Sequence, residues 1–209
     1  MATAIQYEMV RSELEEIVGE GNVSTRESDR LVCATDWFWI PQMWLDRGEE
    51  PVKPDYIVHP GSAEEVAAIL RIANNFRIPV VPWGGGSGSQ GGAATIMGGI
   101  LMDMKRMNRI IEIDEVSLTV TAEAGINGQQ LEWALNEKGL TLPHYAASSN
   151  CATLGGYLAP RGSGTISTKY GKSEELVLSM QVVLPTAEII QTPIVPIHAA
   201  GPDLSLIHI

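Results

Sequence analysis

The chain has 209 residues, enough for one sizeable core or two small subdomains, and 44% of them are apolar, as is typical of a folded protein. Its 25 acidic and 14 basic residues give a net charge of -11, which would repel nucleic-acid phosphates and anionic lipid. The sequence has neither a signal-peptide pattern nor an apolar run of the ~20 residues that a membrane span needs, so we expect a cytoplasmic protein.

A first helix is predicted near the N-terminus, where Val10, Leu14 and Val18 recur at helical spacing before Gly19. From there to Val52 the chain is predicted to be irregular. Its aromatic side chains are expected to be core anchors. They are Trp37, Phe38, Trp39 and Trp44.

A β-α-β segment is predicted next. Tyr56–Val58 has the composition of a short strand, and Ser62 with Glu65 forms a capping box that begins an amphipathic helix. Ile78–Trp83 is predicted as the second strand, and a glycine-rich stretch follows it directly.

Three further strand candidates and a helix follow. Ile100–Met104 alternates only loosely, whereas Ile110–Ile113 and Leu118–Ala122 alternate clearly. Asn127 is predicted to cap a helix that ends near Gly139.

The last part is predicted as a loop of small polar residues over 146–164, a long strand over Leu176–Leu184, and a turn into Glu188–Ile190. The whole pattern predicts the α+β class, with mixed sheets, flanking helices and two β-α-β-like segments.

The spacing of cysteines and histidines argues against a disulfide framework or a metal site. Cys33 and Cys151 lie far apart and outside any C-x-x-C pattern, so we expect free thiols and a small buried residue at Cys151. The four histidines lack the spacing of metal ligands. They stand at positions 59, 144, 198 and 208.

The glycine-rich stretch Gly84–Gly92 favours an anion site, because glycine amides can approach a phosphate closely. It contains a literal G-x-G-x-x-G from Gly86 to Gly91, but no helical pattern follows, as a nicotinamide-binding Rossmann domain would require. A Walker phosphate loop would need a following Lys-Ser or Lys-Thr, which is absent from the sequence. A mobile surface loop is the remaining alternative.

An ordered set of motifs carries a family resemblance over roughly Val10–Leu204. The set comprises Pro60–Val66, Pro82–Gly88, Met107–Ile110, Asp114, Ala122–Ile126, Leu142–Pro143, Ser148–Gly156, Arg161–Gly164, Lys169–Gly171, Glu174–Val177 and Gly201–Leu204. It resembles the FAD-linked oxidase superfamily typified by vanillyl-alcohol oxidase and p-cresol methylhydroxylase. The nearest branches are the glycolate and D-lactate dehydrogenases and alkyldihydroxyacetonephosphate synthase. Pro160 and Gly162 replace the Thr and Ala of the synthase branch.

The resemblance implies two α+β subdomains that bind FAD, with the adenosine and pyrophosphate end along the first glycine-rich loop and the flavin ring near the second set of small residues. Because the stretch 83–92 holds neither His nor Cys, noncovalent FAD is expected. The implied cofactor-binding residues are Pro82, Trp83, Gly84, Gly85, Gly86, Ser87, Gly88, Ser89, Ala147, Ser148, Ser149, Asn150, Cys151, Ala152, Thr153, Gly155, Gly156, Arg161, Gly162, Ser163 and Gly164.

The expected organisation is an N-terminal helix and aromatic-rich segment over 1–55, an FAD-binding domain over 56–204, and a non-native tail over 205–209. Family members continue past this point, so the resemblance implies a C-terminally truncated chain that lacks the catalytic acid and base. For His144 and Arg161, the polar residues near the expected flavin loops, a structural or cofactor-contact role is expected ahead of catalysis.

The resemblance implies an FAD-dependent oxidoreductase that oxidises a small 2-hydroxy acid or related alcohol by hydride transfer to flavin. Two alternatives remain open: a redox-neutral transferase like alkyldihydroxyacetonephosphate synthase, and an inactive FAD-binding fragment. A small-molecule substrate is the expected partner, with an electron acceptor or a second copy of the chain as further candidates.

Overall fold

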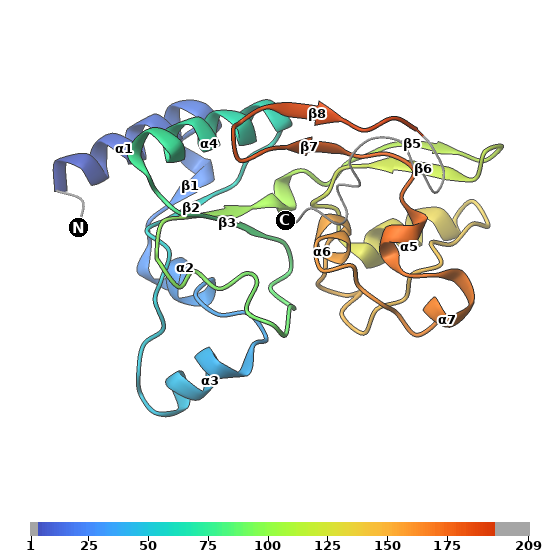
Figure 1. The fold of residues 1–209 in the computed structure, drawn as a ribbon, viewed down its shortest axis with the longest axis horizontal. Helices are drawn as coiled ribbons and strands as arrows, with labels where there is room; N and C mark the ends of the chain where they lie inside the picture. The colour runs from blue at the N-terminus through green and yellow to red at the C-terminus, as the bar shows by residue number, and fades with distance from the viewer. Residues whose placement is uncertain (1–3, 195–209) are drawn as a thin grey trace. The chain divides into compact units, whose positions relative to one another are not determined.

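The computed structural model describes residues 4–194, which form two compact units (Figure 1). Of the described residues, unit 1 holds 4–106 together with Val182–Ile190, and unit 2 holds Met107–Gln181 and 191–194. Within 4–194, no helix is long and apolar enough to cross a membrane. The segment 201–204, the tail 205–209 and two of the histidines lie outside the described residues.

Unit 1 is built on a four-stranded sheet in the order β1-β2-β4-β3. The strands β2, β4 and β3 run parallel, and β1 pairs antiparallel with β2. All four residues of β4 are buried, which explains the loose alternation of this segment, because a strand covered on both faces has no polar side. The strands are β1 (Val23–Ser24), β2 (Tyr56–Val58), β3 (Val80–Trp83) and β4 (Ile100–Asp103).

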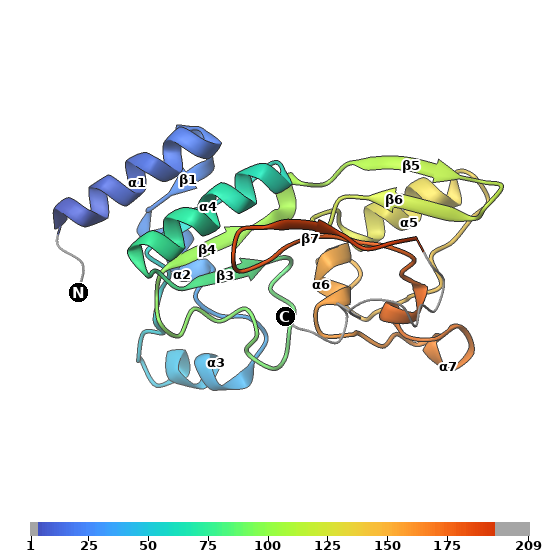
Figure 2. The same cartoon turned by 45° about the horizontal axis from the view of Figure 1, so that its top comes forward.

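Two helices of unit 1, α1 (Ala4–Val18) and α4 (Ala63–Phe76), pack side by side (Figure 2). The capping box is confirmed in a variant form. Ser62 Oγ accepts the amide of Glu65 at 3.2 Å, while Glu65 Oε2 accepts the amide of Gly61 at 2.7 Å. The predicted β-α-β segment is therefore present, with β4 inserted between its two strands.

The prediction of an irregular stretch up to Val52 is wrong. It contains β1, a short 3-10 turn over Glu20–Asn22, and the helices α2 (Glu27–Val32) and α3 (Trp39–Asp46). Helices of six and eight residues complete about two turns, too few for a hydrophobic period to show. Trp37 and Trp39 are also not core anchors, because 72% and 61% of their surface is exposed.

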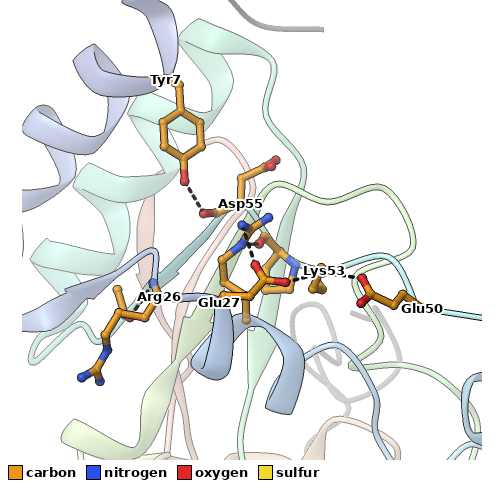
Figure 3. Close-up of polar contacts among 9 residues, drawn as sticks. Tyr7, Arg26, Glu27, Glu50, Lys53 and Asp55 are labelled. Carbon is orange, nitrogen blue, oxygen red and sulfur yellow. Dashed lines mark hydrogen bonds and ion pairs between the residues drawn. The ribbon is translucent and has the colours of Figure 1, made fainter. Parts of the chain in front are cut away.

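A polar network holds the segment that enters β2 (Figure 3). Lys53 lies between the carboxylates of Glu27 and Glu50 and pairs with both. Tyr7 donates a hydrogen bond to the carbonyl of Asp55 at 2.9 Å, and Asp55 Oδ2 accepts the amide of Gly99 at 2.8 Å. The network thus ties α1 and α2 to the residue that precedes β4.

Unit 2 centres on a β-hairpin and a helix. The strands β5 (Ile110–Asp114) and β6 (Thr119–Ala122) pair antiparallel, and α5 (Gly128–Asn136) buries Leu131 and Leu135 beside Ile126. Asn127 Oδ1 accepts the amides of Gln129 and Gln130, which confirms the predicted N-cap. The expected second β-α-β-like segment is not formed within 107–181, because the four residues between β5 and β6 allow only a hairpin.

Two predictions for the last part are wrong in extent. The predicted loop 146–164 contains the helix α6 (Leu154–Leu158), followed by α7 (Ser167–Tyr170). The strand predicted over 176–184 is reduced to β7 (Gln181–Val183): Leu176 belongs to a 3-10 turn over Ser173–Leu176, and 177–180 are irregular. The hairpin partner of β7 is β8 (Ile189–Gln191).

Gly99 is the glycine on which the sheet of unit 1 depends most directly. Its φ is +84°, and a Cβ would overlap the carbonyl oxygen of Pro79, next to β3. We expect Gly99→Ala to lower the free energy of unfolding by about 3 kcal/mol, from left-handed strain plus displaced backbone. Gly48→Ala is the matched control, because Gly48 has a φ of +76° with open space around it, and this variant should lower the free energy of unfolding by only about 1 kcal/mol. Equal urea midpoints for the two variants would contradict this.

Candidate functional site

The first set of predicted site residues follows β3 at one edge of the sheet. Because β2, β3 and β4 are parallel, their carboxyl ends meet there, and such edges commonly carry ligand sites in parallel sheets. The strand β3 ends at Trp83, and the loop over 84–99 returns to the start of β4. Gly88 and Ser89 at its tip are exposed.

Two glycines give the loop its shape, and each stands over an aromatic ring. Gly86 has a φ of +63°, and a Cβ there would overlap the indole of Trp83. Gly91 has a φ of +75°, and a Cβ would lie 2.9 Å from Cδ1 of Phe38. Any larger residue would therefore be strained and would also displace a ring.

The backbone amides of this loop are unusually free. Among residues 4–194, those of 84–92 donate no hydrogen bond to a described residue. Amides left without a protein acceptor need water or a ligand acceptor, and a run of them beside a strand end is suited to an anion. The loop therefore fits a pyrophosphate-bearing cofactor.

Lys105 supplies a positive charge at the start of the loop. Its Nζ lies 2.9 Å from Oδ2 of Asp103 and donates to the carbonyl of Gly84 at 3.3 Å. Asp103 ends β4, is 5% exposed, and also lies 3.6 Å from Nδ1 of His59. The buried carboxylate of Asp103 thus links the end of β4 to His59 after β2 and, through Lys105, to Gly84 after β3.

The second set of predicted site residues lies in unit 2, around the start of α6. Thr153 caps this helix, and its Oγ1 accepts the amide of Gly156 at 3.2 Å. The amide of Gly155 donates to the carbonyl of Ala124 at 2.7 Å. Unlike the amides of the first loop, these two are therefore already used within the protein.

Internal packing accounts for several small residues of this set. A Cβ on Gly155 would lie 3.0 Å from that of Ala124, and one on Gly164 would overlap the backbone of Tyr145. One on Gly162 would lie 3.2 Å from the carbonyl oxygen of Tyr157. The Cβ side of each glycine thus faces the protein itself, so only its other side is open to a ligand.

Exposure divides the second set. Ser149, Ala152 and Thr153 are buried. The prediction of a buried Cys151 is wrong, because its thiol is exposed in the turn before α6. Also exposed are Ala147, Asn150, Gly156, Arg161 and Ser163, while Ser148, Gly155, Gly162 and Gly164 are half-buried. Arg161 has a φ of +54°, which is uncommon outside glycine.

His144 is the buried polar side chain closest to this set. It is 6% exposed, neither ring nitrogen has a hydrogen-bond partner within the described residues, and its ring packs edge-on against Tyr157 at 4.7 Å. Burial lowers the pKa of His144, and the carboxylate of Glu174 only partly opposes this. The imidazole is therefore held neutral, lining a small cavity with Ser149 and Tyr157.

Comparison with known proteins adds the decisive observation. The profile of the family described as "FAD binding domain" matches residues 54–193, two thirds of the chain. The chain belongs to this FAD-binding domain family. Both predicted sets of site residues, 82–89 in unit 1 and 147–164 in unit 2, lie within the matched range.

Relatives of this FAD-binding domain include enzymes of two kinds. Glycolate oxidase subunit GlcD of Bacillus subtilis strain 168 is 32% identical over 183 residues, covering 88% of this chain and 37% of that protein. Alkyldihydroxyacetonephosphate synthase of Caenorhabditis elegans is 37% identical over 164 residues, covering 77% of this chain and 28% of that one. The chain therefore spans well under half the length of either relative.

Solved structures confirm the mixed α+β fold. A structure of alkyldihydroxyacetonephosphate synthase superposes with a TM-score of 0.83 at 30% identity, over 90% of this chain and 38% of that one. A structure of p-cresol methylhydroxylase superposes with a TM-score of 0.78 at 23% identity, over 95% and 38%. The expected two-subdomain architecture of the p-cresol methylhydroxylase type is confirmed.

Sequence reasoning missed three residues that shape the first loop: Asp36, Phe38 and Lys105. Lys105 stands two residues after Asp103, the last residue of β4, so the sequence itself contained a signal for it. Asp36 and Phe38 reach the loop only through the tertiary fold, from more than 45 residues upstream.

The neutral state of His144 has a measurable consequence. Its pKa is lowered in the folded protein, so the unfolded chain binds the proton more readily, and stability must fall as the pH drops through about 6.5. In His144→Leu this contribution is absent. We expect the wild-type chain to lose stability relative to His144→Leu between pH 7.5 and 5.5 in urea titrations. Parallel curves would show that the imidazole is not held neutral.

Proposed function

We propose that this domain binds FAD noncovalently, with the pyrophosphate at the amides of the first glycine-rich loop. The single observation that carries the proposal is that the amides of 84–92, at the carboxyl edge of a parallel sheet, have no acceptor within residues 4–194. A chain with a net charge of -11 can hold such an anion because backbone dipoles act locally and need no excess of basic side chains. Lys105 adds one cation at the start of the loop.

The residues proposed for the adenosine and pyrophosphate end are those of 82–89. Pro82 and Trp83 end the strand, and the glycines that follow let the backbone approach the phosphates. Ser87 and Ser89 add hydroxyl groups that can donate to phosphate oxygens.

The residues proposed for the ribityl and flavin end are those of 147–164. The exposed amide of Asn150 and hydroxyl of Ser163 can serve the polar edge of a flavin. Arg161 would place a cation beside it. The buried members of the set, Ser149, Ala152 and Thr153, would support these residues from beneath.

The proposed reaction is oxidation of a small 2-hydroxy acid or related alcohol. Bound FAD supplies the hydride acceptor. The named residues bind and orient the cofactor, and the group that accepts the hydroxyl proton is not among them. The similarity to glycolate oxidase subunit GlcD supports this substrate class.

A second candidate is a redox-neutral transferase like alkyldihydroxyacetonephosphate synthase. It is favoured by the TM-score of 0.83 and the 37% identity to proteins of that name. The two candidates differ in net electron flow, since only the oxidoreductase passes electrons from substrate to an acceptor.

Cofactor binding is tested by flavin retention after desalting, followed by visible absorption. We expect the wild-type chain to retain FAD and Gly92→Asp to weaken binding at least tenfold, because a carboxylate on the exposed part of the loop, with open space around it, would repel the pyrophosphate. Gly21→Asp adds the same charge to unit 1 at a position with open space, and should bind like wild type. A folded wild-type chain that retains no FAD, or equal binding by the two variants, would overturn the site.

Electron flow is tested by dye reduction. With FAD-loaded protein and a panel of small 2-hydroxy acids, the proposal expects reduction of an artificial dye at a rate that depends on the acid. Flavin retention without dye reduction by any of them would refute the oxidoreductase for this chain. Exchange of the fatty acid of an acyl dihydroxyacetone phosphate for an added long-chain alcohol, without electron flow, would favour the transferase.

A further inference from the structure

The segment between α2 and α3 packs against the first glycine-rich loop through Asp36 and Phe38. It lies outside the residues that match the family, which begin at position 54. Asp36 in this segment is 3% exposed, whereas its neighbour Trp37 is 72% exposed. A buried carboxyl group so close to an exposed indole needs a structural reason, because burying it costs free energy unless it is hydrogen-bonded.

The carboxyl group of Asp36 reaches both sides of the loop tip. Its Oδ1 accepts the amide of Phe38 at 2.9 Å, and its Oδ2 accepts the amide of Ala93 at 3.4 Å. The same Oδ2 lies 3.6 Å from where a Cβ on Gly88 would stand. Asp36 thus holds Ala93 by a hydrogen bond and lies beside Gly88, so its side chain supports the loop on either side of residues 89–92.

Phe38 supports the loop at a second point. Its ring stands behind Gly91, whose left-handed backbone leaves no room for a side chain against it. Trp83 stands in the same way behind Gly86. The two glycines that bend the loop are thus each fixed by a ring, one from β3 and one from the upstream segment.

These contacts bear on how the loop binds an anion. Fixing a glycine-rich chain in one conformation costs more entropy than fixing any other chain. Without contacts that hold the loop, the amides of 84–92 would therefore not point together toward one anion. Asp36 itself is not a ligand contact, because it is almost fully buried and both of its oxygens already accept amides. Its effect on binding is therefore indirect.

We propose that Asp36 and Phe38 are positioning residues for FAD, which hold the glycine-rich loop with its amides available to the pyrophosphate. The inference rests on the proposed function of this loop and extends its site to a segment upstream of the family-matched residues.

The experiment compares FAD with riboflavin, which lacks the pyrophosphate and adenosine, by titration of flavin fluorescence. We expect Asp36→Ala to weaken FAD binding at least tenfold and to change riboflavin binding less than twofold. Asp36→Asn should weaken FAD binding by an intermediate amount, because its one amide oxygen can accept the amide of Phe38 or of Ala93 but not both, and its NH2 group would face the other N–H. Asp46→Ala is the matched control, since Asp46 is exposed on α3 and the variant loses the same charge.

Phe38→Ala removes the ring behind Gly91 without a change of charge. It provides a second test of the inference if Asp36→Ala does not fold. It should weaken FAD at least threefold and leave riboflavin unaffected. Equal FAD affinity in wild type, Asp36→Ala and Phe38→Ala would overturn the inference, as would equal losses for both flavins. A wild-type chain that binds FAD no better than riboflavin would instead refute the proposed function, and this inference with it.

Discussion

The parallel pairing of β4 between β2 and β3 is the constraint on which unit 1 depends. It buries Ile100, Leu101 and Met102 and brings three strand ends to one edge. Asp103 leaves β4 at that edge and meets Lys105, which in turn contacts the first residue of the glycine-rich loop. The pairing in turn requires glycine at Gly99, where a side chain would collide with the backbone beside β3.

At this edge lies the loop that is proposed to bind the pyrophosphate in an acidic protein. Its amides act as partial charges that need no basic side chains, so a net charge of -11 and a pyrophosphate ligand are compatible. In unit 2 the corresponding glycines are bound to their own surroundings, with amides donated to Ala124 and Thr153. Glycine therefore has two uses here: it frees amides in one loop and permits close packing in the other.

Sequence patterns predicted the long elements well. The stripe of α4, the caps at Ser62 and Asn127, and the strands β5 and β6 were predicted close to where they lie, because each has its own periodicity or capping signal. Short elements were missed. The helices α2, α3 and α6 span eight residues or fewer, and their stability comes from packing that no local pattern records.

By itself the sequence determined the family and its FAD cofactor, because ordered motifs and glycine runs are local properties of the chain; the residues of the two glycine-rich sets stay a prediction. Only the tertiary structure decided which of those glycines carry free amides. It also decided that Asp36 and Phe38 stand behind Gly88 and Gly91 and that the ring of His144 is enclosed. Burial and hydrogen bonding depend on partners distant in the chain, and such partners leave no trace in local composition.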